Sequence, residues 1–343
     1  MTAMALTHAL ERLGARHDLT AAETAAAVSA MMAGDASDVA IGAFLTALRV
    51  KGETADELAG AVEAVRSRMT PWPLPERPFP LLDTCGTGGD GAMSVNVSTA
   101  TAVVVAACGV PVAKHGNRSA SGNSGSAEVL QELGVDIEAG PGVLARCLVE
   151  LGITFLFAPQ FHPALRFAAP VRRQLPFRTL FNLIGPLANP ARPDHQIIGV
   201  AGEPQANLIA EAVCRLGTTR VAVVTGADGL DEVTLDGTTQ VRLVERGRVT
   251  RLVWSPADFG LPRVPAPALR VTGPADSAAK LRALFEGKPG PVRDMVLANS
   301  AAALWIATGQ DLRTAVDRAA SAVDNGSART LIERWARLSR DTA

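Results

Sequence analysis

The chain has 343 residues, of which 48% are hydrophobic and 20% charged, as is usual for a globular protein of one large or two moderate domains. Its 33 Lys and Arg residues nearly balance its 34 Asp and Glu residues, so no overall basic field favours nucleic acid or an anionic membrane as a partner. The four cysteines are far apart in sequence, which argues against a disulfide framework or a zinc site.

The N-terminal stretch mixes charged and apolar residues, unlike a signal peptide. No apolar run reaches the roughly 20 residues that a membrane-spanning helix needs. We therefore expect a cytoplasmic protein with no membrane partner.

Residues 3–69 carry only helical signals. Thr20 to Glu23 and Thr54 to Glu57 have the spacing of capping boxes, and Gly34 and Gly52 stand where helices should stop. The apolar face of the last expected helix consists of Leu58, Val62, Val65 and Met69, and that of an earlier helix of Val39, Ile41, Phe44, Leu45 and Leu48. These signals predict a small helical bundle.

Residues 70–80 contain five prolines, which predicts a domain boundary or hinge. Beyond them, strand-like segments alternate with helix-like segments such as 203–216. The expected strands are residues 79–82, 110–113, 153–157, 196–201 and 221–225, followed by a hairpin over 240–254 that turns at Arg246 and Gly247. From residue 276 the pattern is again helical. The fold class is therefore α/β, with a mostly parallel sheet covered by helices.

Two polar loops follow two of the expected strands. After residues 79–82, Gly86, Gly88 and Gly89 allow backbone amides to crowd round an anion. Hydroxyl side chains at 98 and 99 then precede an expected helix over 101–107, and a helix N-terminus suits a phosphate.

The second loop follows residues 110–113 with two cations, Lys114 and Arg118, and the hydrogen-bonding His115 and Asn117. The two loops together predict a cradle for a heavily phosphorylated substrate. Neither a P-loop nor a dinucleotide fingerprint fits, because no Lys-Ser/Thr pair follows Gly89 and no GxGxxG opens the helix.

In these two loops and in several further sequence blocks, the chain resembles the anthranilate phosphoribosyltransferases. The matching blocks are GTGGDG (86–91), NxST (96–99), KHGNR (114–118), a Ser/Gly-rich run ending GSAE (125–128), Arg172 in a PVR block, RTLFNLIGPLANP (178–190) and GLDE (229–232). They cover nearly the whole chain in the order and spacing of that family. Seven ordered blocks are far more specific than any single one.

The resemblance implies a small N-terminal helical domain, residues 1–70, joined by a helical excursion at about 163–185. It also implies a large α/β domain, residues 71–343, with the active site in the cleft between the two. Members of the family are commonly homodimers through the helical domain.

The implied reaction transfers the 5-phosphoribosyl group of phosphoribosyl pyrophosphate (PRPP) to the amine of anthranilate, releasing pyrophosphate with inversion, as a step in tryptophan biosynthesis. Positioning and charge neutralisation can supply most of the catalysis, so no covalent nucleophile is required. In agreement, the sequence has no Ser-His-Asp signal and no GxSxG elbow.

By resemblance, Arg172 would pair with the anthranilate carboxylate as a planar fork, with Gly86 and Asn117 also contacting anthranilate. Asp231 and Glu232, with Ser98, would hold Mg²⁺, which prefers oxygen ligands and bridges to phosphates. The implied PRPP-binding residues are Gly86, Gly89, Asp90, Ser94, Asn96, Val97, Ser98, Thr99, Lys114, His115, Gly116, Asn117, Arg118, Ser119, Ala120, Ser121, Gly122 and Ser126.

Several positions depart from the family pattern: Gly122 and Asn123 replace a usual Ser and Lys, Glu128 an Asp, Phe167 a frequent His, and Leu175-Pro176 a Leu-Gly or Ile-Gly pair. Two other functions stay open. A pyrimidine nucleoside phosphorylase shares the fold but has a different, KHSTGG-like glycine loop. A non-catalytic, nucleic-acid-binding relative would show a basic surface and eroded site residues.

Overall fold

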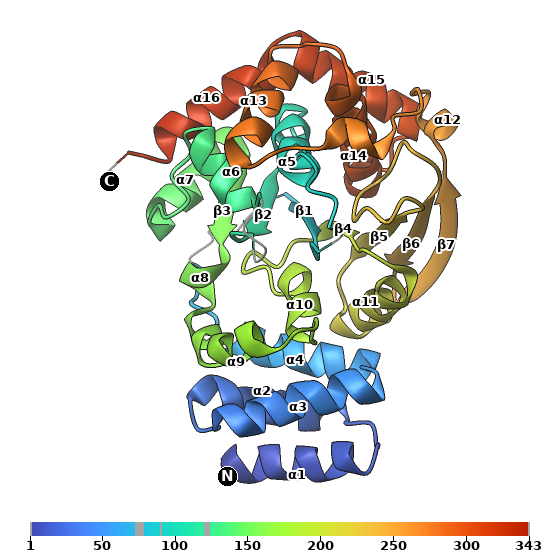
Figure 1. The fold of residues 1–343 in the computed structure, drawn as a ribbon. Helices are drawn as coiled ribbons and strands as arrows, with labels where there is room; N and C mark the ends of the chain where they lie inside the picture. Colours follow the sequence, from blue (N-terminus) through green and yellow to red (C-terminus); the bar gives the residue numbers. More distant parts are fainter. Residues whose placement is uncertain (1, 73–78, 90, 120–123, 342–343) are drawn as a thin grey trace.

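A computed structural model describes residues 2–72, 79–89, 91–119 and 124–341. Figure 1 shows a stack of N-terminal helices at one end of the molecule and a sheet wrapped by helices at the other. No helix in the described part of the chain is long and apolar enough to cross a membrane.

The N-terminal part consists of α1 (Thr2–Gly14), α2 (Ala21–Ala33), α3 (Asp38–Lys51) and α4 (Ala55–Ser67). Both predicted capping boxes are confirmed. The side chains of Thr20 and Thr54 cap α2 and α4, and the side chains of Glu23 and Glu57, at the third helical position, accept hydrogen bonds from the backbone amides of the two threonines. Gly34 ends α2 in a left-handed conformation, as expected of a C-terminal glycine.

The predicted apolar faces are only partly correct. Leu58, Val62 and Val65 are buried on α4, but Met69 lies beyond the end of that helix. Val39 is 83% exposed although Ile41 is buried. Residues two positions apart in a helix, such as Val39 and Ile41, are separated by about 200° around the helix axis. Val39 therefore points away from the face that Ile41 buries.

Seven strands form one sheet in the order β3-β2-β1-β4-β5-β6-β7. The strands are β1 (Leu82–Gly86), β2 (Val112–Gly116), β3 (Ile153–Phe157), β4 (His195–Gly199), β5 (Arg220–Gly226), β6 (Thr239–Glu245) and β7 (Arg248–Trp254). The first five are parallel, and β6 and β7 form the predicted antiparallel hairpin at the edge. The mostly parallel sheet is therefore confirmed.

Three predicted boundaries near the polar loops were wrong. The first two strands extend further along the chain than expected, because the polar residues Asp83, Thr84 and Lys114 are buried inside them with internal partners. The helix expected at residue 101 begins at Val97 as α5 (Val97–Ala107). Ser98 and Thr99 consequently lie in its first turn and not ahead of it.

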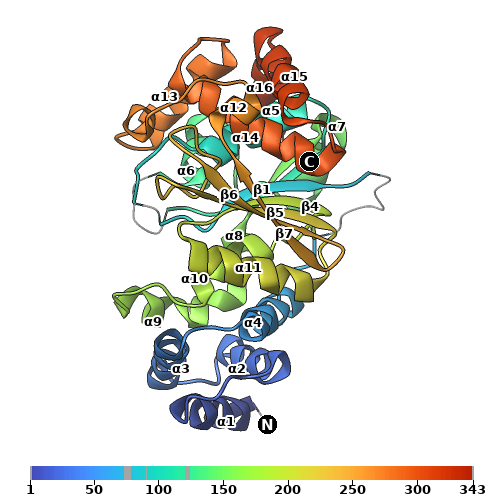
Figure 2. The same cartoon turned by 90° about the vertical axis from the view of Figure 1, so that its right-hand side faces the viewer.

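Helices cover both faces of the sheet, as the view in Figure 2 shows. On one face lie α5 and α14 (Pro291–Thr308), backed by α15 (Leu312–Asp324) and α16 (Ser327–Leu338). Around them stand α6 (Ser126–Glu132), α7 (Pro141–Leu151), α12 (Pro256–Phe259), a 3-10 turn (Ala266–Leu269) and α13 (Pro274–Phe285). This layer and the sheet enclose a first apolar core.

The other face of the sheet shares a second core with the N-terminal helices. α11 (Glu203–Leu216) lies on this face and also packs against α4. Side chains of the sheet, such as Ile198 and Val223, belong to the same buried cluster as Val213 of α11 and Leu58 of α4. The helical bundle is thus packed continuously onto the α/β layer.

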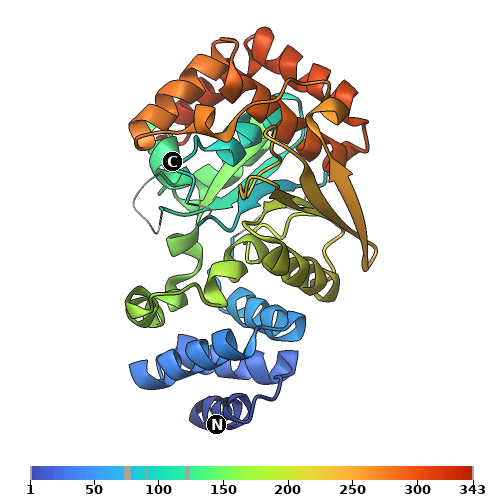
Figure 3. The ribbon, with the colours of Figure 1, turned by 45° about the vertical axis from the view of Figure 1, so that its right-hand side comes forward.

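Between β3 and β4 the chain returns to the helical bundle (Figure 3). It does so through α8 (Ala158–Phe161), a 3-10 turn (Pro163–Phe167), α9 (Ala169–Gln174), α10 (Phe181–Ile184) and a second 3-10 turn (Gly185–Leu187). The first of these 3-10 turns packs on α2, α9 packs on α3, and α10 packs on α4. Within this segment, the 3-10 turn of residues 163–167 and α9 are separate short pieces, and each has a proline in its first turn.

Candidate active site

The polar segments predicted from the sequence leave the carboxyl ends of three parallel strands of the sheet. The glycine loop follows β1, the loop of Asn117 and Arg118 follows β2, and the segment of Asp231 and Glu232 follows β5. Because parallel strands end at one edge of a sheet, all three meet there. Ligands of open α/β sheets bind at this edge.

Asp231 is joined directly to the glycine loop. Its Oδ2 accepts a hydrogen bond from the Gly88 amide at 2.7 Å. A Cβ at Gly86 would lie 2.5 Å from the same oxygen, so the carboxylate can approach the loop only because residue 86 is a glycine. The acidic segment and the glycine loop therefore form one structural unit.

Glu232 lies at the N-terminus of α5. Its Oε1 accepts a hydrogen bond from the Ser98 amide at 3.1 Å, which is a favourable place for a carboxylate on a helix. The adjacent Thr99 is only 1% exposed, and its hydroxyl has no hydrogen-bond partner within the described residues. Val97 is also buried, so only its backbone can face a ligand.

Lys114 was predicted as a cation of the loop after the second strand, and this placement was wrong. It lies inside β2 and is 2% exposed; its Nζ donates to the Thr84 carbonyl and lies 3.3 Å from Ser98 Oγ. Burial lowers the pKa of the amine, and the carboxylate of Asp83 opposes that shift. Lys114 thus lies beneath the first turn of α5 and holds it against β1.

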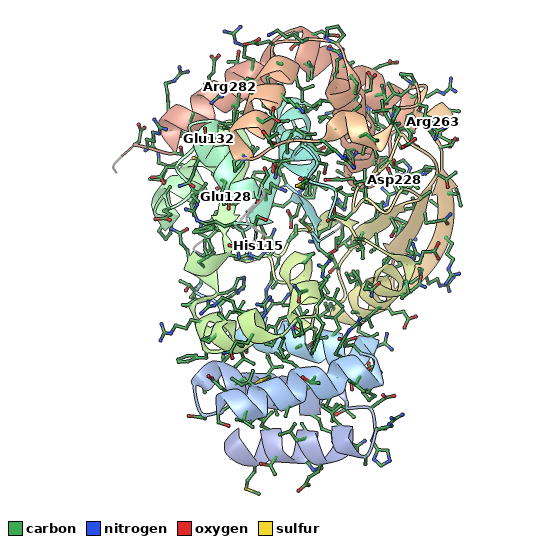
Figure 4. All side chains as sticks on the ribbon, in the orientation of Figure 1. His115, Glu128, Glu132, Asp228, Arg263 and Arg282 are labelled. Carbon is green, nitrogen blue, oxygen red and sulfur yellow. The ribbon has the colours of Figure 1, made fainter. Side chains whose placement is uncertain are left out.

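His115 faces the segment that returns to the helical bundle (Figure 4). Its Nδ1 lies 3.1 Å from the Gly185 carbonyl oxygen, and its ring lies edge-on to His162 with 5.2 Å between centroids. Burial lowers the pKa of His115 to about 3 and that of His162 to about 4, so both rings are neutral near pH 7.

The loop after β2 is held by its own side chains. Asn117 Oδ1 accepts from the Arg118 amide at 2.7 Å, and the Asn117 carbonyl accepts from Ser126 Oγ at 3.3 Å. Arg118 donates to Gln131 and stacks on Phe157. Gly116 ends β2 so close to Ser126 Oγ that a Cβ would lie 2.3 Å from it.

Glu128, which departs from the family pattern, lies on α6 and accepts a hydrogen bond from the Ser119 amide at 3.1 Å. The longer acid therefore serves as an anchor for the loop. Phe167 also departs from the pattern, and its ring lies against Gly34 of the helical bundle. Leu175 packs at the edge of the second core.

Asn96 connects the two loops to a more distant helix. Its Oδ1 accepts from Ser124 Oγ at 2.6 Å and from Ser277 Oγ at 2.9 Å, and Ser277 belongs to α13. Ser94 pairs with Arg270 in an isolated β-bridge. Both residues fix the path of the glycine loop into α5, and sequence reasoning gave no sign of Ser277.

Arg172 projects from α9 in the segment that returns to the bundle. Its guanidinium lies 5.3 Å from the centre of the Phe181 ring. Burial lowers its pKa, without a compensating carboxylate from the described part of the chain. A half-buried planar cation of this kind suits a carboxylate brought by a ligand.

Four of the predicted site residues, Asp90, Ala120, Ser121 and Gly122, lie outside the described residues, as does Asn123. Arg178 is the first residue of the RTLFNLIGPLANP block, and the sequence pattern indicated no role for it. In the structure, Arg178 Nη1 donates to the Gly88 carbonyl at 2.5 Å and Nη2 to the Thr87 carbonyl at 2.8 Å.

A cavity of about 420 Å³ opens beside the glycine loop. Its walls include Thr87 and Gly89 of the loop, Arg178 of the returning segment, and Arg49 and Glu53 of the helical bundle. Helical bundle, returning segment and glycine loop therefore meet at one place.

The chain matches two families of domains and several named proteins. Residues 7–69 match the glycosyl transferase family, helical bundle domain, and residues 79–329 match the glycosyl transferase family, a/b domain. Relatives named anthranilate phosphoribosyltransferase are 47% identical in Methylobacterium radiotolerans (94% of this chain, 93% of the relative) and 47% identical in Thermomicrobium roseum (97% of each).

Solved structures agree with these matches. The crystal structure of anthranilate phosphoribosyltransferase from Thermus thermophilus superimposes with a TM-score of 0.91 at 41% identity, covering 97% of this chain and 99% of that one. The Saccharomyces cerevisiae enzyme in complex with PRPP and Mg superimposes with a TM-score of 0.89 at 27% identity, covering 97% of each chain.

Proposed function

This chain belongs to the anthranilate phosphoribosyltransferase family, and on that premise we propose that it transfers the 5-phosphoribosyl group of PRPP to the amine of anthranilate, releasing pyrophosphate, in tryptophan biosynthesis. The observation that carries the proposal is the meeting of the glycine loop with Asp231 and Glu232 at the carboxyl edge of the sheet. The names of the relatives favour this reaction over a nucleoside phosphorylase or a nucleic-acid-binding function.

The glycine loop and the first turn of α5 would bind the phosphates of PRPP. Backbone amides at a glycine loop and at a helix N-terminus attract anions without bringing a second negative charge. Catalysis would then depend on holding the anomeric carbon near the amine while the leaving group departs. Because His115 is neutral and Lys114 is buried, neither would bind phosphate as a freely exposed cation. Both would instead support the site from within β2.

Asp231 and Glu232 would hold Mg²⁺ together with the substrate. Two adjacent carboxylates fit this ion, because Mg²⁺ usually takes one or two protein carboxylates and completes its shell with water and phosphate oxygens. When bound, the ion would neutralise charge on the departing pyrophosphate.

Arg172 would pair with the carboxylate of anthranilate. Its burial leaves a cation whose charge has no compensating acid in the described part of the chain. Anthranilate brings both a carboxylate and an aromatic ring to this position, next to Phe181. The amine would then face Gly86 of the glycine loop and Asn117 of the loop after β2.

Loss of anthranilate fluorescence in the presence of PRPP and Mg²⁺ tests the reaction. We expect a loss that requires all three components, and for Arg172→Ala a KM for anthranilate at least about tenfold higher with little change in the KM for PRPP. Arg173→Ala is the matched control, because Arg173 is its exposed neighbour on α9. A wild-type protein that binds PRPP but never consumes anthranilate would show that the acceptor is a different amine.

We also propose a cytoplasmic homodimer that forms through the helical bundle. Met4, Val39 and Val50 are large apolar side chains that stand exposed on α1 and α3. Val50 also lines a hollow of about 330 Å³ together with Leu13 and Ala47. Light scattering after size exclusion should give the mass of two chains, and Val39→Glu combined with Val50→Glu should give one.

A further inference from the structure

Hydrogen bonds from β4, Arg178 and Asp231 fix the orientation of the peptide groups at Thr87 and Gly88 of the glycine loop. The Thr87 amide donates to the Gly199 carbonyl of β4 at 2.9 Å. The Thr87 carbonyl accepts from Arg178 Nη2, and the next amide, that of Gly88, donates to Asp231 Oδ2. Since the C=O and N–H of a trans peptide point in opposite directions, Arg178 and Asp231 grip the two ends of one peptide group.

The following peptide group is gripped at one end only. The Gly88 carbonyl accepts from Arg178 Nη1 at 2.5 Å, so the Gly89 amide of the same peptide plane points away from Arg178. The guanidinium also lies close to Gly89, where a Cβ would be 2.3 Å from Nη1. One arginine fork therefore sets the direction of two successive peptide groups.

This orientation matters because Gly88 and Gly89 are both in left-handed conformations, with φ of +62° and +79°. Glycine peptides rotate easily, and a rotated peptide would present a carbonyl oxygen to an anion in place of an amide. A cation that binds both carbonyls keeps their negative ends on the side of the returning segment and leaves the Gly89 amide on the opposite side.

Arg178 belongs to the segment that joins α9 to α10, and α10 packs on α4 of the helical bundle. The Thr179 amide, next in the chain, donates to Asn182 Oδ1 at the start of α10. The side chain of Arg178 also lines the cavity that includes Arg49 and Glu53 of the bundle. The arginine thus connects the position of the helical bundle to the shape of the glycine loop.

We propose that Arg178 is a positioning residue for PRPP: it holds the Thr87 and Gly88 carbonyls away from the phosphates and so makes the glycine loop receptive to them. The inference rests on the proposed function, which supplies PRPP as the ligand. Arg178 would act through its hydrogen bonds to the two loop carbonyls.

Arg178→Ala and Arg178→Lys test this role, with Arg166→Ala as the control. Arg166 is an exposed arginine of the same returning segment that stacks on Phe167 and contacts no part of the loop that the structure describes. We expect Arg178→Ala to raise the KM for PRPP about 10- to 100-fold, since two hydrogen bonds from a charged donor are lost, and to change the KM for anthranilate less than about threefold. Arg178→Lys should recover part of the loss, because an ammonium can bind one carbonyl but cannot act as a fork.

Calorimetric titration of wild-type protein and variants with PRPP and Mg²⁺ separates this inference from the proposed reaction. If wild type binds PRPP without consuming anthranilate, the reaction is wrong, and weaker binding by Arg178→Ala still supports the positioning role. A purely structural role would instead lower thermal stability and shift both KM values equally. That result, or a KM and dissociation constant for PRPP within twofold of wild type, would overturn the proposal, as would wild-type protein that does not bind PRPP.

Discussion

The charge of Lys114 on β2 acts on the buried carboxylate of Asp83 on β1. Burial raises the pKa of Asp83 and lowers that of Lys114, and each group opposes the shift of the other. Asp83 also accepts hydrogen bonds from Asn189 Nδ2 at 2.9 Å and from the His115 amide at 3.3 Å. Each charge therefore offsets part of the cost of burying the other in the part of the sheet from which both polar loops leave.

Replacing Lys114 by Met should be strongly destabilising. The carboxylate of Asp83 would remain buried without its cation, and removing one partner of a buried pair costs about 3–5 kcal/mol in the free energy of unfolding. Urea denaturation measures this. Lys288→Met, at an exposed lysine, is the control, and adding Asp83→Asn to Lys114→Met should recover part of the loss. Strictly additive losses would show that the two charges do not interact.

Asp231→Asn should lower kcat/KM for PRPP on the order of 10²-fold, because it removes a charge proposed to hold Mg²⁺ and weakens the bond to the Gly88 amide. More Mg²⁺ should also be needed for half-maximal rate. Asp317→Asn, at an exposed acid of α15, should leave both quantities unchanged. An unaltered Mg²⁺ requirement in Asp231→Asn would exclude the proposed metal role.

Gly86→Ala tests the close approach of Asp231 to the glycine loop. The added methyl group would lie 2.5 Å from Asp231 Oδ2, so the carboxylate must move and the Gly88 bond must lengthen. We expect a stability loss of about 1–3 kcal/mol, as for other overpacked sites, with a rise in the KM for PRPP. Gly142→Ala, in open space on α7, should be neutral. Equal effects of the two substitutions would contradict the packing argument.

The two buried histidines should make stability depend on pH. Burial lowers the pKa of His115 to about 3 and of His162 to about 4, below the value near 6.5 of the unfolded chain. Between these limits the unfolded chain binds more protons, so the free energy of unfolding falls as pH decreases from about 6.5, by up to about 1.4 kcal/mol per pH unit for each histidine.

Urea midpoints at pH 7.5 and pH 5.5 measure that slope. His162→Asn should flatten it relative to wild type, whereas His17→Asn, at an exposed position, should not. A slope that is the same in wild type and His162→Asn would mean that the ring is protonated in the folded protein.

The sequence predicted the architecture well because its signals there are local. The capping boxes at Thr20 and Thr54 and the turn at Arg246-Gly247 depend on residues close in sequence, and all three are confirmed. Strand ends were less predictable. Lys114 reads as a loop residue by polarity, and only its long-range contacts with Thr84 and Ser98 explain why it is inside β2.

The same limit applies to the candidate site. The ordered motifs in the sequence indicated which loops form the candidate site. The structure shows which residues of these loops contact one another. The grip of Arg178 on Thr87 and Gly88 joins residues about ninety positions apart, and the bond of Asp231 to Gly88 joins residues still further apart. No periodicity or spacing rule reports such contacts.

The second apolar core has a consequence for how this protein can be recombined with its relatives. Family matching divides the chain near residue 70, yet Leu58 of α4, Val213 of α11 and Val223 of β5 share one buried cluster across that division. A chimera that takes residues 1–70 from one relative and the remainder from another would join two surfaces that were never fitted to each other. Exchanging α4 together with α11 is the swap that keeps the interface matched.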